Sequence, residues 1–326
     1  MTWITFILSS AVIVYAATQL AKYGDVIALR TKMSGMFIGT LLLAGATSLP
    51  EVLTTLQSIR LGIPNLAAGN LLGSNMFNMC LLAILDLTHR NQHLLRNAAR
   101  KHALTGSLAV FIIAAVVFFI LADIQISIGW VGVDSLIVIL IYIIAIRLIQ
   151  QQSGVARNIQ TEVPPGTPSL LRGLVGFTIA AGVLILITPT MVQASNEIAE
   201  STGLGTTFIG TTLVALVTSL PEMVTTIAAV RIGAADMAIG NLFGSNLFNM
   251  FAIGLADIFY TQGRYLAIID PSFLLVGMLG LLMTCLALIG NLARLEKRFL
   301  FVEVDALALL LVYFGGLWLL FSRSAM

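Results

Sequence analysis

Ten apolar stretches of membrane-spanning length constrain the fold of this chain more than any other feature. They cover approximately residues 3–21, 36–59, 65–86, 103–123, 129–149, 173–193, 207–230, 236–257, 272–292 and 303–321. A helix of about 20 mostly apolar residues crosses the hydrocarbon layer of a bilayer. Only 10% of the residues are charged, whereas soluble domains carry about 25%. The sequence therefore predicts an all-α, polytopic membrane protein with ten transmembrane helices.

The longest polar connector, residues 150–172, divides the chain into five-helix halves at 1–149 and 173–326. In this arrangement fourteen of the seventeen Lys and Arg residues lie on connectors at one side of the membrane. Because basic connectors stay in the cytoplasm, we expect the linker there and both termini outside. The net charge of +2 and the absence of a basic patch argue against nucleic acid as a partner. The compact length favours a prokaryotic inner (plasma) membrane.

One segment of each half is repeated. Residues 39–86 read GTLLLAGATSLPEVLTTLQSIRLGIPNLAAGNLLGSNMFNMCLLAILD, and residues 210–257 read GTTLVALVTSLPEMVTTIAAVRIGAADMAIGNLFGSNLFNMFAIGLAD. They align without a gap at an offset of 171, with 24 of 48 positions identical. Corresponding helices of the two copies are five spans apart, an odd number, so the copies should cross the membrane in opposite senses. Inverted repeats of this kind are typical of transporters that work by alternating access.

Glu51 and Glu222 lie at matching positions of the two repeats, inside apolar segments. A carboxylate at the bilayer centre costs at least about 2.5–3.5 kcal/mol and survives where it faces protein or binds an ion. Two such groups repel each other unless protons or a cation neutralise them. Helical spacing places Thr47 beside the first glutamate, with Thr218 beside the second. Oxygen ligands of this kind favour Ca²⁺ or Na⁺, so we expect a cation site.

The second helix of each repeat carries a polar stripe. It consists of Asn70, Ser74 and Asn78 in the first copy and Asn241, Ser245 and Asn249 in the second. Asparagine in a membrane helix can bind a ligand or a neighbouring helix, and the sequence leaves both open. The GxxxG glycines of these helices indicate close helix packing. Acidic residues near the predicted ends of spans, including Asp86, Asp134 and Asp257, are expected to be solvated.

The pairs TSLPE with GSNMFN and TSLPE with GSNLFN resemble the two α-repeats of the cation/calcium exchanger superfamily, most closely the sodium/calcium exchangers. The resemblance is specific over residues 39–86 and 210–257. It implies a ten-helix fold in which the first and sixth helices slide to switch access. It also implies the ligands of Ca²⁺ and Na⁺. These are Glu51, Glu222, Thr47, Thr218, Ser48, Ser219, Ser74, Ser245, Asn78 and Asn249, with the carbonyls of Ala44 and Ala215.

The chain departs from the family pattern in two ways. The glycine before Thr-Ser is Ala46 in one copy and Val217 in the other, and Asn249 stands where some relatives have Asp. With Asn249 in place of Asp the site has two acids instead of three. The stoichiometry, the coupling ion and any role of K⁺ therefore stay open.

Exchange of Ca²⁺ for Na⁺ is the first functional hypothesis. Exchange of Ca²⁺ for H⁺ is the runner-up, although the proton-coupled branch carries a GNAxE motif in place of TSxPE. An intramembrane enzyme using the paired glutamates is a remote alternative. Acid and base catalysis needs two groups in unlike environments, and no nucleophile or phosphate-binding motif accompanies the pair. A channel is less consistent with an inverted repeat. No cofactor is expected.

Overall fold

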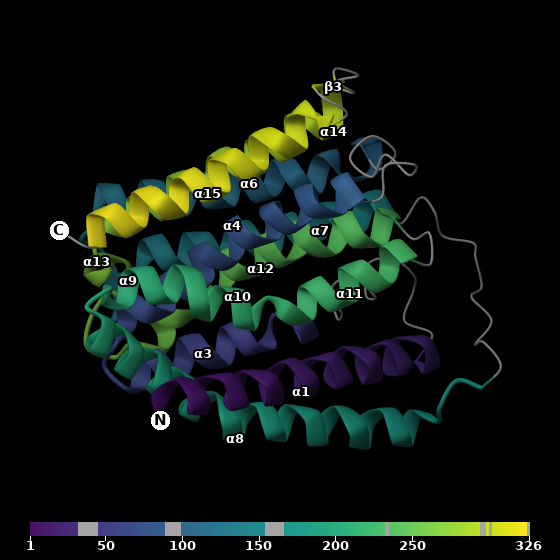
Figure 1. Cartoon of the computed structure of the whole chain (residues 1–326), viewed down its shortest axis with the longest axis horizontal. Coiled ribbons are helices and arrows are strands. Elements are labelled where there is room, and N and C mark those ends of the chain that lie inside the picture. Colours follow the sequence, from purple (N-terminus) through teal and green to yellow (C-terminus); the bar gives the residue numbers. More distant parts are fainter. Residues whose placement is uncertain are drawn as a thin grey trace.

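A computed structural model of the chain describes residues 1–31, 45–88, 99–153, 166–231, 235–293, 298–299 and 302–324. Most of these residues are helical (Figure 1). The long helices are α1 (Thr2–Arg30), α4 (Pro64–Thr88), α6 (Ala99–Ala122), α7 (Val133–Ser153), α8 (Leu170–Thr202), α12 (Ala235–Phe259), α14 (Ser272–Ala293) and α15 (Val304–Ser324). All eight are long and apolar enough to cross a membrane.

A broken helix forms one further candidate span. It comprises α9 (Gly205–Ile209), the π-helical turn η2 (Gly210–Val214), α10 (Ala215–Thr218) and α11 (Leu220–Arg231). The axis bends by 43° at the break after Thr218. The matching segment of the first half contains α3 (Leu49–Arg60). The structure therefore accounts for eight or nine spans in its described parts. The tenth stays a prediction, because residues 36–44 of the expected span 36–59 lie outside the described ranges.

Helices α4 and α12 lie in the middle of the bundle (Figure 1) and pack against each other. Nearly every face of α4 is buried, against η2, α3, α12, α14 and α15. The close approach to η2 depends on Gly69 and Gly73. A Cβ atom added at Gly73 would lie 2.4 Å from the Thr211 carbonyl oxygen and 2.7 Å from Thr211 Cα. The packing role predicted for these two glycines is confirmed.

Helices α1 and α8 pack together along one side of the bundle (Figure 1). Their contact forms a hydrophobic cluster, distinct from the main core, that includes Ile13, Leu20, Leu184 and Met191. Both helices extend beyond the expected stretches 3–21 and 173–193. The 33 residues of α8 rise about 50 Å, more than the roughly 30 Å of hydrocarbon. Hydropathy marks only the part of a helix that lies in lipid, whereas backbone hydrogen bonding continues through its polar ends.

Short antiparallel hairpins precede α7 and α15. In the first, β1 (Ser127–Ile128) pairs with β2 (Val131–Gly132), and in the second, β3 (Arg298–Phe299) pairs with β4 (Val302–Glu303). The start of α1 and the end of α15 lie at the same end of the bundle (Figure 1). The described chain is thus one helical bundle, whose central helices carry the two repeated segments.

Candidate cation site

A serine interrupts the helix just before each glutamate. Ser48 has φ −88° and ψ 8°, and Ser219 has φ −87° and ψ 2°. A proline follows two residues later in both copies, and proline lacks the N–H that would continue the helical hydrogen bonds. Glu51 and Glu222 therefore stand in the first turns of new helices, α3 and α11. The N-terminal end of a helix is partially positive, and this favours a carboxylate.

The two glutamates are held crosswise by the serines. The Ser48 hydroxyl donates to Oε1 of Glu222 at 2.8 Å. The Ser219 hydroxyl donates to Oε1 of Glu51 at 3.1 Å. Both carboxylates are 1% exposed. Each acid is thus fixed by the repeat to which it does not belong, and the two breaks meet at one point.

The threonines and the amide of Asn70 complete this junction. Thr218 donates to Oδ1 of Asn70 at 2.9 Å, and the Asn70 side chain donates to the Glu51 carbonyl oxygen at 3.2 Å. Thr47 and Ser245 both interact with the Glu222 side chain. Ser48 also lies 3.3 Å from Ser245, oxygen to oxygen. The structure therefore brings the predicted threonines and Ser245 to the glutamates.

Four asparagine side chains of α4 and α12 contact one another in two pairs. Asn78 donates to Oδ1 of Asn246, and Asn249 donates to Oδ1 of Asn75, each at 3.0 Å. Asn75 and Asn246 were missed as site residues in the sequence reasoning. Their presence in the repeated GSN of both copies was the available signal.

Several buried oxygens near this junction have no hydrogen-bond partner within the described part of the chain. They are Oε2 of Glu51 and of Glu222, Oγ of Ser74, and Oδ1 of Asn78 and of Asn249. Burying a polar atom without a hydrogen-bond partner costs free energy, so a group of such atoms indicates a ligand-binding site. Carboxylate, hydroxyl and amide oxygens are the donors that hard cations prefer. The donor set fits Ca²⁺ or Na⁺ as cargo.

The family resemblance implies two backbone carbonyl groups as ligands, and the structure describes one of them. Ala44 lies outside the described residues. The Ala215 carbonyl oxygen accepts the Ser219 N–H at 3.1 Å and lies 3.4 Å from the Thr218 hydroxyl. Its part in binding a cation remains a prediction, and a cation there would compete with those contacts.

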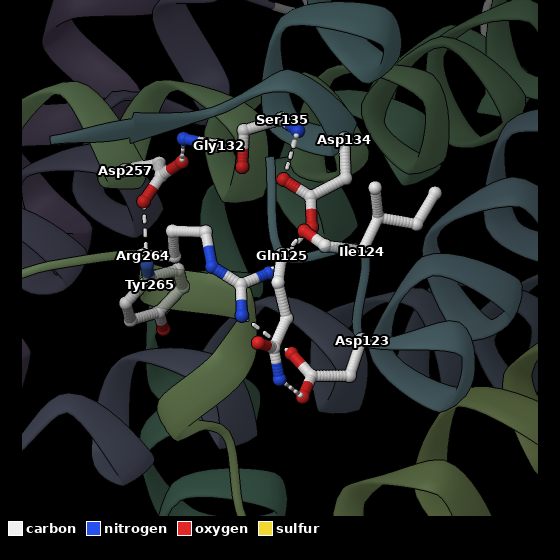
Figure 2. A network of polar contacts seen from close by, with 9 residues as sticks. All are labelled: Asp123, Ile124, Gln125, Gly132, Asp134, Ser135, Asp257, Arg264 and Tyr265. Atoms are coloured by element: carbon white, nitrogen blue, oxygen red, sulfur yellow. Dashed lines mark hydrogen bonds and ion pairs between the residues drawn. The ribbon is translucent and has the colours of Figure 1, made fainter. Parts of the chain in front are cut away.

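A second polar network joins the first hairpin, the start of α7 and the loop after α12 (Figure 2). Asp257 accepts the backbone N–H groups of Gly132 and Tyr265. Arg264 pairs with Asp123 at 2.6 Å and lies 3.7 Å from Asp134. Asp257 is 0% and Asp134 1% exposed, so the expectation that both are solvated is wrong. Hydropathy placed them near a membrane surface, but the loop after α12 and the first hairpin fold over them. The same expectation is wrong for Asp86 in α4, which is 2% exposed.

Comparisons with known proteins identify the family to which the chain belongs. A family model described as sodium/calcium exchanger protein matches residues 1–149 and 172–322. The putative antiporter CaxA of Alkalimonas amylolytica is 26% identical over 322 residues, 95% of each chain.

Two solved exchangers share the fold. The H⁺/Ca²⁺ exchanger CAX superposes with a TM-score of 0.74 at 15% identity, over 99% of this chain and 85% of that chain. The sodium–calcium exchanger NCX_Mj gives 0.59 at 22% identity, over 98% and 99%. Because the family model covers both halves, the chain belongs to the sodium/calcium exchanger protein family and is a membrane antiporter of the cation/calcium exchanger superfamily, not an enzyme.

Proposed function

We propose that this antiporter exchanges Ca²⁺ for Na⁺, with Ca²⁺ bound between Glu51 and Glu222. The observation that carries the proposal is the crosswise junction, in which Oε1 of each acid is bound by a serine while Oε2 has no hydrogen-bond partner in the described structure. The charge of the pair matches one Ca²⁺ or two Na⁺. Ca²⁺ takes six to eight oxygens, and the junction offers carboxylate, hydroxyl and amide oxygens. The two cargoes would therefore compete for the same groups.

Alternating access is proposed from the repeat, which we take to be inverted and to span the whole chain as ten helices in two halves joined by residues 150–172. The ends of α3, α4 and α7 recur as the ends of α11, α12 and α15 at the offset of 171 found in the sequence. Both hairpins recur at the same offset. The shared offset supports duplication well beyond residues 39–86. The separate packing cluster of α1 and α8 supports their role as the sliding pair.

Exchange of Ca²⁺ for H⁺ is the second candidate. It is favoured by the presence of only two acids at the junction, because two protons would neutralise them as completely as two Na⁺. In the described residues no group of three or more His, Cys, Asp or Glu side chains is suited to a metal ion. Among its relatives in fold, NCX_Mj is named a sodium–calcium exchanger and CAX an H⁺/Ca²⁺ exchanger. The coupling ion therefore needs direct measurement.

The test is uptake of ⁴⁵Ca²⁺ into proteoliposomes preloaded with Na⁺, K⁺ or acidic buffer. We expect uptake that requires an outward Na⁺ gradient and is lost in Glu51→Gln and in Glu222→Gln. Thr284→Ala is the matched control, because Thr284 is buried and donates to a carbonyl of its own helix. Uptake driven by the proton gradient alone would replace Na⁺ by H⁺ as the coupling ion. Absence of Ca²⁺ flux under every gradient would refute Ca²⁺ as the cargo.

We also propose a prokaryotic inner membrane, with both termini outside and the linker in the cytoplasm. The distribution of Lys and Arg supports this orientation, and the common position of the two chain ends (Figure 1) agrees with an even number of spans. If the C-terminus lies outside, a fluorescent reporter that does not fold after export should stay dark when fused after residue 326. Alkaline phosphatase, which is active only outside the cytoplasm, should be active at the same place. The opposite pattern would reverse the orientation.

A further inference from the structure

In each of the two asparagine pairs of α4 and α12, one side chain donates a hydrogen bond and the other accepts it. Asn78 and Asn249 each donate an N–H and leave Oδ1 without a partner in the described residues. Asn75 and Asn246 each use Oδ1 to accept that N–H. All four side chains are at most 1% exposed, so no bulk water substitutes for a missing contact. One member of each pair is thus an acceptor for the other.

An amide can present either an oxygen or an NH₂ group to its surroundings. Only the oxygen binds a cation, and an NH₂ group at the same place would repel it. A side chain of this kind is therefore a cation ligand only when something fixes which way it faces. The partner amide can do this, because an acceptor oxygen attracts the NH₂ group and turns the oxygen away.

The backbone supplies a fixed reference for one of the two pairs. The NH₂ group of Asn246 lies 3.5 Å from the carbonyl oxygen of Asn75. A carbonyl oxygen can only accept, so this long contact favours the orientation of Asn246 in which its own Oδ1 faces Asn78. Asn78 then has to offer its NH₂ group and turn Oδ1 the other way. The order of contacts runs from backbone carbonyl to Asn246 to Asn78.

We infer that Asn246 and Asn75 are positioning residues that turn the amide oxygens of Asn78 and Asn249 toward the transported cation. The inference rests on the proposed function, since it takes the oxygens of Asn78 and Asn249 as cation ligands. Neither positioning residue has to touch the cation. They act like the outer partners that orient metal ligands in other proteins.

The test is whether Asn246 is still needed for cation binding when the amide of Asn78 is replaced by a carboxylate. Asn246→Ala removes the acceptor, and we expect Ca²⁺ binding to weaken by about 10–100-fold, as when other outer partners of metal ligands are lost. In an Asn78→Asp background both oxygens of residue 78 are acceptors, so its orientation no longer matters. There the same Asn246→Ala change should alter the Kd by less than about 3-fold, which is under 1 kcal/mol.

The measurement is calorimetric titration of the purified full-length protein with Ca²⁺, and with Na⁺ if Ca²⁺ does not bind. Size-exclusion profiles verify that each variant is folded. The mirror set, Asn75→Ala with and without Asn249→Asp, provides an independent test if a variant of the first set fails to fold. Equal losses in the Asn and Asp backgrounds would mean that Asn246 and Asn75 only stabilise the helix crossing, and would overturn the inference alone. Wild-type protein that binds neither cation would overturn the proposed function and the inference with it.

Discussion

Gly73 should tolerate no side chain, because α4 approaches the π-helical turn η2 there. The Cβ atom of Gly73→Ala would lie 2.4 Å from the Thr211 carbonyl oxygen and 2.9 Å from Ala215 Cβ. Restoring a tolerable 3.0–3.4 Å requires a relative movement of 0.6 to 1.0 Å between two packed helices. The first obstacle is backbone and not the tip of a flexible side chain, so the change cannot be absorbed by a rotamer.

Overpacking of this kind costs about 1–3 kcal/mol, which corresponds to a fall of about 2–10 °C in unfolding temperature. The assay is thermal unfolding of the purified protein in detergent, with ⁴⁵Ca²⁺ flux measured in parallel. Flux should fall too, because Ala215 is only four residues before Ser219, whose hydroxyl binds Glu51.

Gly182→Ala is the matched control. It lies within α8, and a Cβ atom there would meet nothing within 4 Å. Alanine is favoured over glycine in a helix by up to about 1 kcal/mol, so this variant should be as stable as the wild type or more stable. If Gly73→Ala also unfolds at or above the wild-type temperature, the close packing of α4 on η2 is refuted.

Three further predictions follow from the polar contacts. Ser48→Ala and Ser219→Ala should each raise the KM for Ca²⁺ by a similar factor, about 5–15-fold for the loss of one hydrogen bond of about 1–1.5 kcal/mol. Flux measurements in which only one serine matters would contradict the crosswise arrangement. Arg264→Gln leaves the buried carboxylate of Asp134 without its cation, a change that destabilises by up to about 3–5 kcal/mol, whereas the exposed Arg323→Gln should leave the unfolding temperature within a degree. The hydrogen bond from Arg264 lowers the pKa of Asp123 below 3.8. The ion pair between these two residues therefore stabilises the fold above about pH 4, and this stabilisation is lost as the pH falls through the lowered pKa. The difference in unfolding temperature between wild type and Asp123→Asn should shrink accordingly, and a difference that persists at the lowest pH would contradict the ion pair.

Sequence reasoning succeeded where the signal is local. Hydropathy located the long helices, although it marked α1 and α8 too short. The repeated TSLPE pointed to the glutamates and threonines, and the family resemblance to the serines, that the structure brings to one junction. It failed for Asp134 and Asp257, because burial there depends on a loop and a hairpin folding over the end of the bundle. Asn75 and Asn246 were missed because one repeated motif contains several polar residues, and spacing alone does not tell which of them face the other repeat.

The sequence by itself determined that this chain enters a membrane, that it is built from two related segments and that each carries one glutamate. These conclusions depend only on the type and order of the residues. Bilayer thickness sets the length of each apolar helix, and the energy of a buried charge requires that each glutamate face protein or an ion. Only the tertiary structure decided which groups pair. The hydrogen bonds that define the site join residues 168 to 174 positions apart. Their partners depend on how α3, α4, α11 and α12 cross in space, and no local pattern in a sequence specifies a crossing.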